Sequence, residues 1–193
     1  MLFLSINMEG KKHHRRSIRL LQVDYNTPGF YFITLCAYQR ELLFGQIENG
    51  EMKLNENGKV VDEWWQKIEI RYPGVFLDAF VIMPNHIHGI VLITDNATVG
   101  AIHELPLQLD ETSPDTWAKR RKMLLPKIIG YFKMNSAKAI NKMRDLERVP
   151  VWQRNYYEHI VRNQDSLNRI RQYIRDNPIN WYTDPDNPIY AQI

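Results

Sequence analysis

The feature that most constrains this chain is an apolar run interrupted by two histidines, Val81-Ile-Met-Pro-Asn-His86-Ile-His88-Gly-Ile-Val-Leu-Ile93. The segments on either side of Pro84-Asn85 are rich in β-branched and aromatic residues, and this pair suits the centre of a tight turn. The run therefore predicts a β-hairpin. Because side chains alternate between the faces of a strand, His86 and His88 should share one face, where both imidazoles could bind one divalent ion.

A lone histidine in a strand is more often a satisfied core or edge residue than a ligand. Two histidines on one face are harder to explain as structure, because burying each polar ring without a partner costs on the order of 1 to 3 kcal/mol. The pair therefore favours metal ligation or catalysis over a purely structural role.

Length and composition fit one globular domain, since 44% of the 193 residues are hydrophobic. We expect one domain over residues 1–193, with a basic N-terminal arm over about residues 1–27 and a C-terminal tail over about residues 179–193. No apolar run approaches the roughly 20 residues that span a bilayer, and the N-terminus does not resemble a secretory signal. A cytoplasmic protein without a membrane partner is expected. The single cysteine, Cys36, excludes an intramolecular disulfide and a cysteine-based zinc site, and should be a buried strand residue.

The charges are sorted along the chain, although the net charge is only +3. Residues 11–19 hold five Lys or Arg and no acid, and residues 119–144 hold nine and no acid. Such blocks usually form solvated faces, but blocks this large without opposing acids favour a polyanion, because each neutralised phosphate releases counterions. Nucleic acid is therefore the expected partner. The candidate phosphate contacts are Arg15, Arg16, Arg19, Lys127, Lys133, Lys138, Lys142, Arg154 and Arg162.

Two further β segments are predicted before the histidine hairpin. β-Branched and aromatic residues predict a central strand over 30–36, which should neighbour that hairpin. Asn49-Gly50 predicts a small hairpin between the segments 42–47 and 52–54.

Helical spacing of apolar residues predicts two helices on either side of a loop. The first is capped by Asn55 and ends at residues 72–74, with its tryptophan pair in the core rather than stacked on bases. The second starts near Pro126 and runs to about Met143. Between them, the acidic stretch over 95–117 has no period and predicts a long loop.

Residues 151–161 form another strand candidate, in which Tyr156, Tyr157 and His159 lie close to arginines. Aromatic side chains beside basic ones suit stacking on single-stranded bases. A strand packed in the core would have a similar pattern, so both interpretations stay open.

The last predicted helix starts at a cap formed by Asp165 or Ser166 and ends before Asn177-Pro178. At about 100° per residue, Tyr173 and Asn177 are ~40° apart on the helix and flank one edge of its apolar stripe. That geometry suits a nucleophile beside a metal ligand. Taken alone, a tyrosine and an asparagine four residues apart are usually structural.

Four motifs together resemble the HUH single-tyrosine transposases, in particular the REP-associated tyrosine transposase branch. They are Arg15-Arg-Ser-Ile-Arg-Leu20, Met83-Pro-Asn-His-Ile-His88, Val151-Trp-Gln-Arg-Asn-Tyr-Tyr-Glu-His-Ile-Val-Arg-Asn163 and Gln172-Tyr-Ile-Arg-Asp-Asn-Pro178. The resemblance runs from about Arg15 to Trp181, and the ordered set is far more specific than His-x-His alone. It implies a ferredoxin-like (RRM-like) α+β domain, with an antiparallel sheet that carries the histidines and helices on one face.

The resemblance also implies roles for residues. His86 and His88 would ligate a divalent metal, Mg²⁺ or Mn²⁺, with Asn177 completing the site, and Tyr173 would attack single-stranded or hairpin DNA in a monomer or homodimer. Many relatives in the wider superfamily have Gln four residues after the tyrosine, where this chain has the shorter Asn177. Because the imidazoles must be neutral to bind metal, activity is expected to fall below about pH 6.

Other classes with paired histidines fit the sequence less well. Histidine-triad hydrolases require a third histidine where this chain has Ile90. Two-histidine phosphoesterases require the motif His-x-Ser/Thr twice, and Gly89-Ile90 after His88 does not provide it. The stronger alternative is a non-catalytic single-stranded nucleic-acid-binding module of RRM-like fold. Metal-dependent nicking would separate the two.

Overall fold

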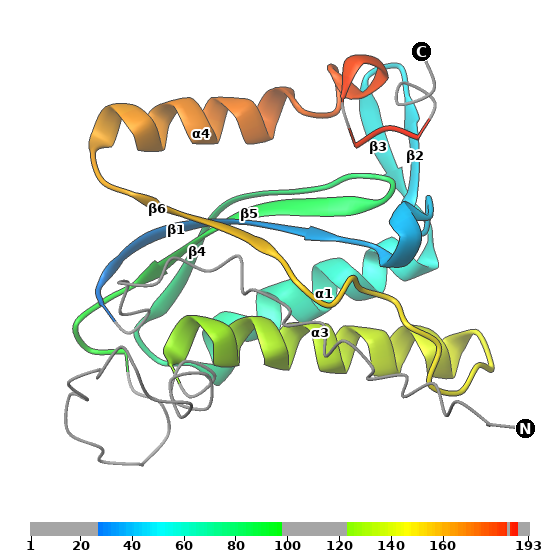
Figure 1. Ribbon diagram of the computed structural model, residues 1–193, viewed down its shortest axis with the longest axis horizontal. Helices are drawn as coiled ribbons and strands as arrows, with labels where there is room; N and C mark the ends of the chain where they lie inside the picture. The colour runs from blue at the N-terminus through cyan, green and yellow to red at the C-terminus, as the bar shows by residue number, and fades with distance from the viewer. Residues whose placement is uncertain (1–26, 98–122, 185, 189–193) are drawn as a thin grey trace, which may run out of the picture.

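The computed structural model describes residues 27–97, 123–184 and 186–188. In this part of the chain, four antiparallel strands form one sheet in the order β4-β5-β1-β6, two more form a separate hairpin, and three α-helices pack around them (Figure 1). The strands are β1 (Gly29–Cys36), β2 (Gly45–Glu48), β3 (Glu51–Leu54), β4 (Val75–Ile82), β5 (His86–Ile93) and β6 (Tyr157–Val161). The helices are α1 (Glu56–Arg71), α3 (Leu124–Met143) and α4 (Gln164–Asp176), with short 3-10 helices η1 (Tyr38–Arg40) and η2 (Trp181–Thr183). The α+β class with an antiparallel sheet is confirmed.

The predicted histidine hairpin forms one side of the sheet, with β4 at its edge and β5 inside it. β4 and β5 are joined by the turn at Pro84 and Asn85, where the Met83 N–H donates to the His86 carbonyl at 2.8 Å. β5 also pairs with β1 along its whole length, and β1 lies between β5 and β6, so the strand predicted over 30–36 is central and neighbours the histidine hairpin, as expected. Nearly all of β5 is buried, because core side chains cover both faces of this strand.

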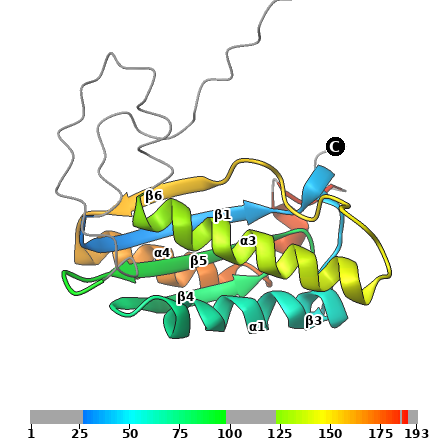
Figure 2. The same ribbon diagram turned by 90° about the horizontal axis from the view of Figure 1, so that it is seen from below.

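α1 and α3 lie side by side across one face of the sheet and bury the larger apolar core (Figure 2). α1 begins where the side chain of Asn55 accepts the Gly58 N–H at 3.0 Å, as predicted. Trp65 of α1 is fully buried, stacks on Phe80 with ring centroids 4.6 Å apart and meets Phe132 of α3 edge-on. This tryptophan therefore belongs to the core, as expected.

α4 lies on the opposite face of the sheet, which corrects the expectation that the helices share one face (Figure 1). Leu167 and Ile174 of α4 pack against Phe32 of β1 and Ile90 of β5 in a second, smaller core cluster. Both faces of the central strands carry apolar side chains, so both need to be covered, and α4 covers the face that carries the histidines.

The segment before β6 departs from the strand predicted over 151–161. Only Tyr157–Val161 pairs with β1, while Trp152 makes a single bridge to Ala37. The buried Trp152 Nε1 donates to the Ser136 hydroxyl of α3 at 2.9 Å. This bond fixes the segment against α3, while backbone hydrogen bonds from Gln153 to Cys36 and from Tyr38 to Val151 hold it beside the end of β1.

α4 has a different cap from either of the two predicted. Asn163 takes the extended conformation, and its Oδ1 accepts the Ser166 N–H at 2.8 Å, so neither Asp165 nor Ser166 is the cap. The helix ends at Asp176, before Pro178, as predicted. 

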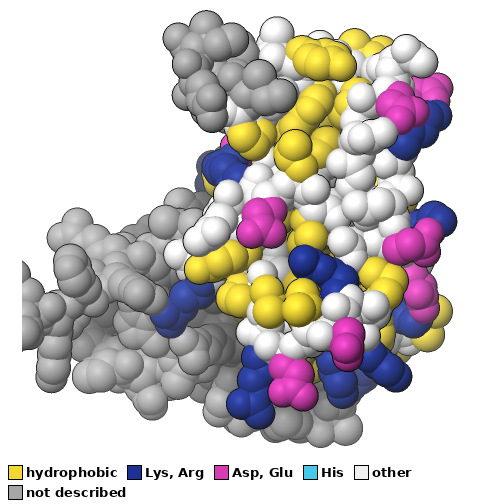
Figure 3. All heavy atoms as spheres, turned by 90° about the vertical axis from the view of Figure 1, so that its right-hand side faces the viewer, with side chains coloured by type: hydrophobic (Ala, Val, Ile, Leu, Met, Phe, Trp, Pro, Cys, Tyr) yellow, Lys and Arg dark blue, Asp and Glu magenta, His cyan; other side chains and the backbone are white. Residues whose placement is uncertain are grey.

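β2 and β3 form the small predicted hairpin. Asn49 and Gly50 have positive φ angles of 53° and 77°, as a two-residue hairpin turn of type I′ requires. The end of the molecule that carries this hairpin bears basic and acidic side chains side by side, not one continuous basic field (Figure 3). Within the described ranges, no helix is long and apolar enough to cross a membrane.

Part of the sequence prediction falls outside the described residues. These are most of the loop predicted over 95–117 and the basic arm with Arg15, Arg16 and Arg19.

Candidate active site

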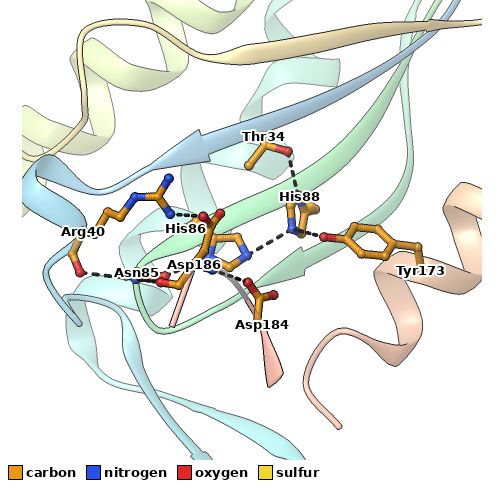
Figure 4. A network of polar contacts seen from close by, with 8 residues as sticks. All are labelled: Thr34, Arg40, Asn85, His86, His88, Tyr173, Asp184 and Asp186. Carbon is orange, nitrogen blue, oxygen red and sulfur yellow. Dashed lines mark hydrogen bonds and ion pairs between the residues drawn. The ribbon is translucent and has the colours of Figure 1, made fainter. Parts of the chain in front are cut away.

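The two histidines of β5 point to the same face of the sheet, beneath α4. His86 is fully buried and His88 is 4% exposed, and their Nε2 atoms lie 3.1 Å apart (Figure 4). The strand positions them as the alternation of the sequence predicts, with Ile90 continuing the same face into the smaller core cluster.

The turn before β5 fixes the protonation of His86. The Asn85 side chain donates its Nδ2 hydrogens to the carbonyls of Asp186, at 2.7 Å, and Arg40, at 3.3 Å. The Asn85 Oδ1 is therefore free to accept, and His86 donates its Nδ1–H to it at 2.8 Å. A neutral His86 then presents the lone pair of Nε2 toward His88.

His88 is oriented by the neighbouring strand. Its Nδ1 lies 2.8 Å from the hydroxyl of Thr34, which pairs with His88 across the β1–β5 register. A hydrogen bond from Nδ1–H to Thr34 leaves the Nε2 lone pair of His88 facing that of His86. Two lone pairs 3.1 Å apart repel each other unless a proton or a cation lies between them, so this pair of nitrogens is a ready cation-binding element.

Burial keeps both imidazoles neutral. It is the main reason why the pKa of His86 is lowered to about 3, an effect that the Arg40 guanidinium reinforces and the Asn177 side chain opposes. Burial, and then the proximity of His86, lower the pKa of His88 well below its ordinary value. The pH threshold of about 6 assumed ordinary pKa values, and the lowered pKa values move the expected threshold for these histidines to a lower pH.

Tyr173 of α4 reaches the histidines from the other side. Its hydroxyl lies 3.1 Å from His88 Nε2, and its ring packs edge-on against Phe32. The side chain is about half exposed, so the hydroxyl can be approached from solvent. Burial, followed by the Asp184 carboxylate, raises the pKa of the phenol, and the Asn177 side chain opposes this shift.

Asn177 follows the last residue of α4 and is 2% exposed. Its Oδ1 is buried without a hydrogen-bond partner, although the side chain interacts with both His86 and Tyr173. A buried carbonyl oxygen without a partner is costly unless something binds it.

The chemistry of these donors fits a divalent cation. Two neutral imidazoles and one amide oxygen are ligands that Mg²⁺ and Mn²⁺ accept, with Mn²⁺ better suited to imidazole. In the described part of the chain, no group of three His, Cys, Asp or Glu could hold a metal, and the amide oxygen of Asn177 is the candidate for a third ligand. His86, His88 and Asn177 are the residues that would hold the ion.

A cavity of about 420 Å³ opens beside Tyr173. It is large enough to admit part of a nucleotide, and it is lined by Phe32, Thr34, Cys36, Arg40, His88, Gln153, Asn155, Tyr156, Tyr157, Tyr173 and Asp186. Cys36, expected to be buried, is only partly buried at this cavity, where burial raises the pKa of its thiol.

The two interpretations of the aromatic segment divide between neighbouring residues. Tyr156 is buried in the larger core. Tyr157 is 56% exposed and His159 is exposed, and both pair with β1 residues whose side chains lie on the histidine face. Tyr157 and His159 are thus available for stacking, whereas Tyr156 packs in the core.

The predicted phosphate contacts are dispersed. Lys127, Lys138 and Lys142 belong to α3, which covers the face of the sheet opposite the histidines (Figure 2). Arg154 and Arg162 are exposed close to the two ends of β6.

Lys133 of α3 has a different environment from the other lysines of that helix. Its Nζ donates to the carbonyls of Gln153, at 2.5 Å, and Arg154, at 3.0 Å. It therefore supports the segment that lines the cavity.

Four residues near the histidines were not singled out from the sequence: Thr34, Arg40, Asn85 and Asp184. Asn85 was recognised only as a turn residue. Thr34 and Arg40 come from β1 and the chain after it, and only the strand register could have placed them here.

No family model matches the chain. The fold is similar to that of a REP-associated tyrosine transposase bound to a REP hairpin, with a TM-score of 0.47 and 19% identity over 80% of this chain and 68% of the other. It is also similar to a protein of Deinococcus radiodurans that is provisionally described as a transposase, with a TM-score of 0.45 and 14% identity over 78% of this chain and 91% of the other. Likenesses of this size say nothing about activity.

The sequence comparison found a much closer relative. An uncharacterized protein of Haemophilus influenzae is 44% identical over 172 residues, which are 89% of this chain and 92% of that protein. Identity at this level over nearly the whole of both chains establishes common descent. The chain therefore belongs to the same protein family as this Haemophilus influenzae protein.

Proposed function

We propose that this protein is a metal-dependent enzyme that nicks and rejoins single-stranded DNA through a covalent 5′-phosphotyrosine, as in the REP-associated tyrosine transposases that its motifs resemble. One observation carries the proposal. The Tyr173 hydroxyl lies 3.1 Å from His88 Nε2, which lies 3.1 Å from His86 Nε2, with the partnerless Oδ1 of Asn177 buried beside them. A potential nucleophile and three potential metal ligands thus meet at one point.

In the proposed reaction, the Tyr173 oxygen attacks the phosphorus of a DNA phosphodiester. The new bond joins the tyrosine oxygen to phosphorus, and the bond from phosphorus to the 3′-oxygen of the preceding nucleotide breaks. The phenol loses its proton and the departing oxygen gains one, so the products are a 5′-phosphotyrosine and a free 3′-hydroxyl. Because the covalent link conserves the phosphodiester, a 3′-hydroxyl can reverse the attack and join strands without ATP.

The surroundings of Tyr173 are arranged for this attack but do not ionise it in advance. Its pKa is raised, mainly by burial, so the phenol keeps its proton at neutral pH, and in the metal-free protein it can donate that proton in a hydrogen bond to His88 Nε2, whose lone pair a bound ion would take instead. This bond and the edge-on contact with Phe32 hold the phenol in a fixed orientation. Mg²⁺ or Mn²⁺, when bound, would polarise the phosphate and favour loss of the phenol proton.

The proposed substrate is a single DNA strand, which can extend from a hairpin. The cavity beside Tyr173 has about 420 Å³, and the exposed ring of Tyr157 lies at its wall. Aromatic faces stack on unpaired bases whatever their sequence. A base next to the scissile phosphate could therefore occupy this cavity.

The test replaces Tyr173 by Phe, which removes one oxygen and keeps the ring. We expect hairpin-bearing single strands to bind unchanged, while Mn²⁺-dependent cleavage and the covalent DNA adduct both disappear. Tyr182→Phe is the matched control, because Tyr182 is a tyrosine with 70% exposure outside the site. Mass spectrometry should locate the wild-type adduct on the peptide of Tyr173, and an adduct on Tyr156 or Tyr157 would contradict the mechanism.

A second candidate function is a non-catalytic single-stranded nucleic-acid-binding module. The exposed Tyr157 and His159, side by side on the histidine face, favour it. Tight binding of single strands without nicking, at saturating Mn²⁺ and over a panel of hairpins, would support this function instead.

A further inference from the structure

The chain just after β1 has an unusual backbone. Gln39 and Arg40 both have positive φ angles, 54° and 57°, which side chains other than glycine adopt rarely and at a cost. The segment is held in place by the turn before β5. The Ala37 N–H donates to the Asn85 carbonyl at 2.8 Å, and the Asn85 Nδ2 donates to the Arg40 carbonyl at 3.3 Å.

Because Asn85 also accepts from His86, this strained segment and the histidines are parts of one hydrogen-bonded unit. Strain that the surrounding structure maintains next to a functional site often serves that site. The Arg40 side chain is therefore a candidate for a role in the site formed by His86 and His88.

The guanidinium of Arg40 extends toward the histidines and forms an ion pair with Asp186 (Figure 4). Among the described residues that line the cavity, Arg40 is the sole cation. Its charge acts on the groups of the site: burial raises the pKa values of Cys36 and Asp184, and Arg40 opposes both shifts, while burial lowers the pKa of His86 and Arg40 reinforces that shift. Positive potential from Arg40 is thus directed at the place where the proposed reaction puts a phosphate.

We propose that Arg40 binds a non-bridging oxygen of the phosphate that Tyr173 attacks, and that the DNA takes the place of Asp186. The inference rests on the proposed function and deepens it by naming a substrate-binding residue. A planar guanidinium can donate two parallel hydrogen bonds to a phosphate as it does to a carboxylate. In the free protein the Nη1 of Arg40 donates to one oxygen of the Asp186 carboxylate, which stands where a phosphate oxygen would bind.

The replacement of Asp186 by DNA at Arg40 predicts an effect on DNA binding that a purely structural ion pair would not have. If Asp186 competes with DNA for Arg40, removing its charge should strengthen DNA binding. If the pair serves only to hold the C-terminal segment, then breaking it from either side should weaken binding alike.

The test uses the Tyr173→Phe protein, in which the strand stays intact. Single strands carry one uncharged methylphosphonate in place of each phosphate in turn, and their affinities are measured with Arg40 and with Arg40→Gln. With Arg40 present, we expect a methylphosphonate at the phosphate that the wild-type protein cleaves to lower the affinity on the order of tenfold. In Arg40→Gln, the same methylphosphonate should cause no such loss of affinity. Arg40→Lys, which keeps the charge without the fork, should give an intermediate loss. Arg144→Gln, an exposed arginine at the end of α3, controls for the loss of one positive charge.

Asp186→Asn provides the second arm, and we expect it to tighten binding of the unmodified strand. Equal methylphosphonate losses with Arg40 and Arg40→Gln would overturn the proposal, as would a loss centred on a different phosphate. Weakened binding in Asp186→Asn, equal to that in Arg40→Gln, would assign the pair a structural role. These measurements need no cleavage by the variants, so an adduct found on another tyrosine would refute the proposed nucleophile without deciding the role of Arg40.

Discussion

Replacing Asn177 by Leu removes the buried Oδ1 that has no hydrogen-bond partner and keeps a side chain of similar size. A buried acceptor without a partner costs about 1 to 3 kcal/mol, and the interactions of the amide with His86 and Tyr173 offset part of that cost. We therefore expect the free energy of unfolding of the metal-free protein to rise by about 1 kcal/mol. A substitution of this kind inside a core usually lowers stability.

The same variant should lose metal binding. In the wild-type protein, Mn²⁺ at about 100 times its dissociation constant should raise the free energy of unfolding by about 2.7 kcal/mol. If the loss of the third ligand weakens binding about a hundredfold, that gain falls to about 0.4 kcal/mol at the same Mn²⁺ concentration. Urea unfolding after treatment with a chelator, and again with Mn²⁺ added, measures both quantities.

Asn177→Asp is the matched control, and its effects should have the opposite signs. A buried carboxylate lowers the stability of the metal-free protein, but it keeps an oxygen ligand and adds charge, so stabilisation by Mn²⁺ should persist. The reasoning is refuted if Asn177→Leu destabilises the metal-free protein and leaves the Mn²⁺-induced gain unchanged. In that case Asn177 is an ordinary structural residue.

Three further predictions follow from the packing and the charges around the site. Gly89→Ala should lower the free energy of unfolding by about 1 to 3 kcal/mol, because the new Cβ would lie 2.4 Å from the Trp65 ring. The same change should cost less in a Trp65→Leu background, and unchanged urea unfolding of the single variant would refute this. Asp78→Asn should cost about 1 kcal/mol and weaken the docking of α4, because it disrupts the paired hydrogen bonds from Arg171, which we expect to see as faster hydrogen exchange in α4 alone. With a pKa of about 3 in the folded protein, His86 should make metal-free stability fall as pH drops from about 6.5 toward 3, by roughly 2 kcal/mol between pH 6.5 and 5, and an equal fall in His86→Gln would contradict this.

The sheet and its histidines could be predicted from the sequence because local patterns determine them. Alternation and the turn at Pro84-Asn85 give β4 and β5, and the alternation also puts His86 and His88 on one face. Asn55 caps α1 as predicted, because its side chain accepts the Gly58 N–H three residues later. Each of these features depends on neighbours in the sequence.

The start of α4 shows where local reasoning fails. Several polar side chains near residue 165 can cap a helix, and the choice depends on which residue takes an extended backbone. In the structure this is Asn163, which is separated from the end of β6 by one residue. The position of the strand therefore selects the cap.

The residues that orient the site were beyond sequence reasoning for a similar cause. Thr34 meets His88 only through the register between β1 and β5. Arg40 has a positive φ although it is not a glycine, so the sequence holds no glycine that would predict the turn that brings Arg40 to the cavity. Both depend on pairings between distant parts of the chain.

The position of α4 was the main error in the predicted fold, and it determines how the site is assembled. The histidines are carried by a central strand whose other face packs into the larger core, whereas the tyrosine is carried by a helix that rests on the smaller cluster and on the Asp78–Arg171 pair. The histidines are therefore held by more of the core than the tyrosine is. A perturbation that loosens the smaller cluster displaces Tyr173, and with it Asn177 at the end of α4, while leaving His86 and His88 in place, so the nucleophile and the third ligand should be lost before the histidine pair is disturbed. This inequality follows from the placement of one helix on the face that the sequence pattern did not assign to it.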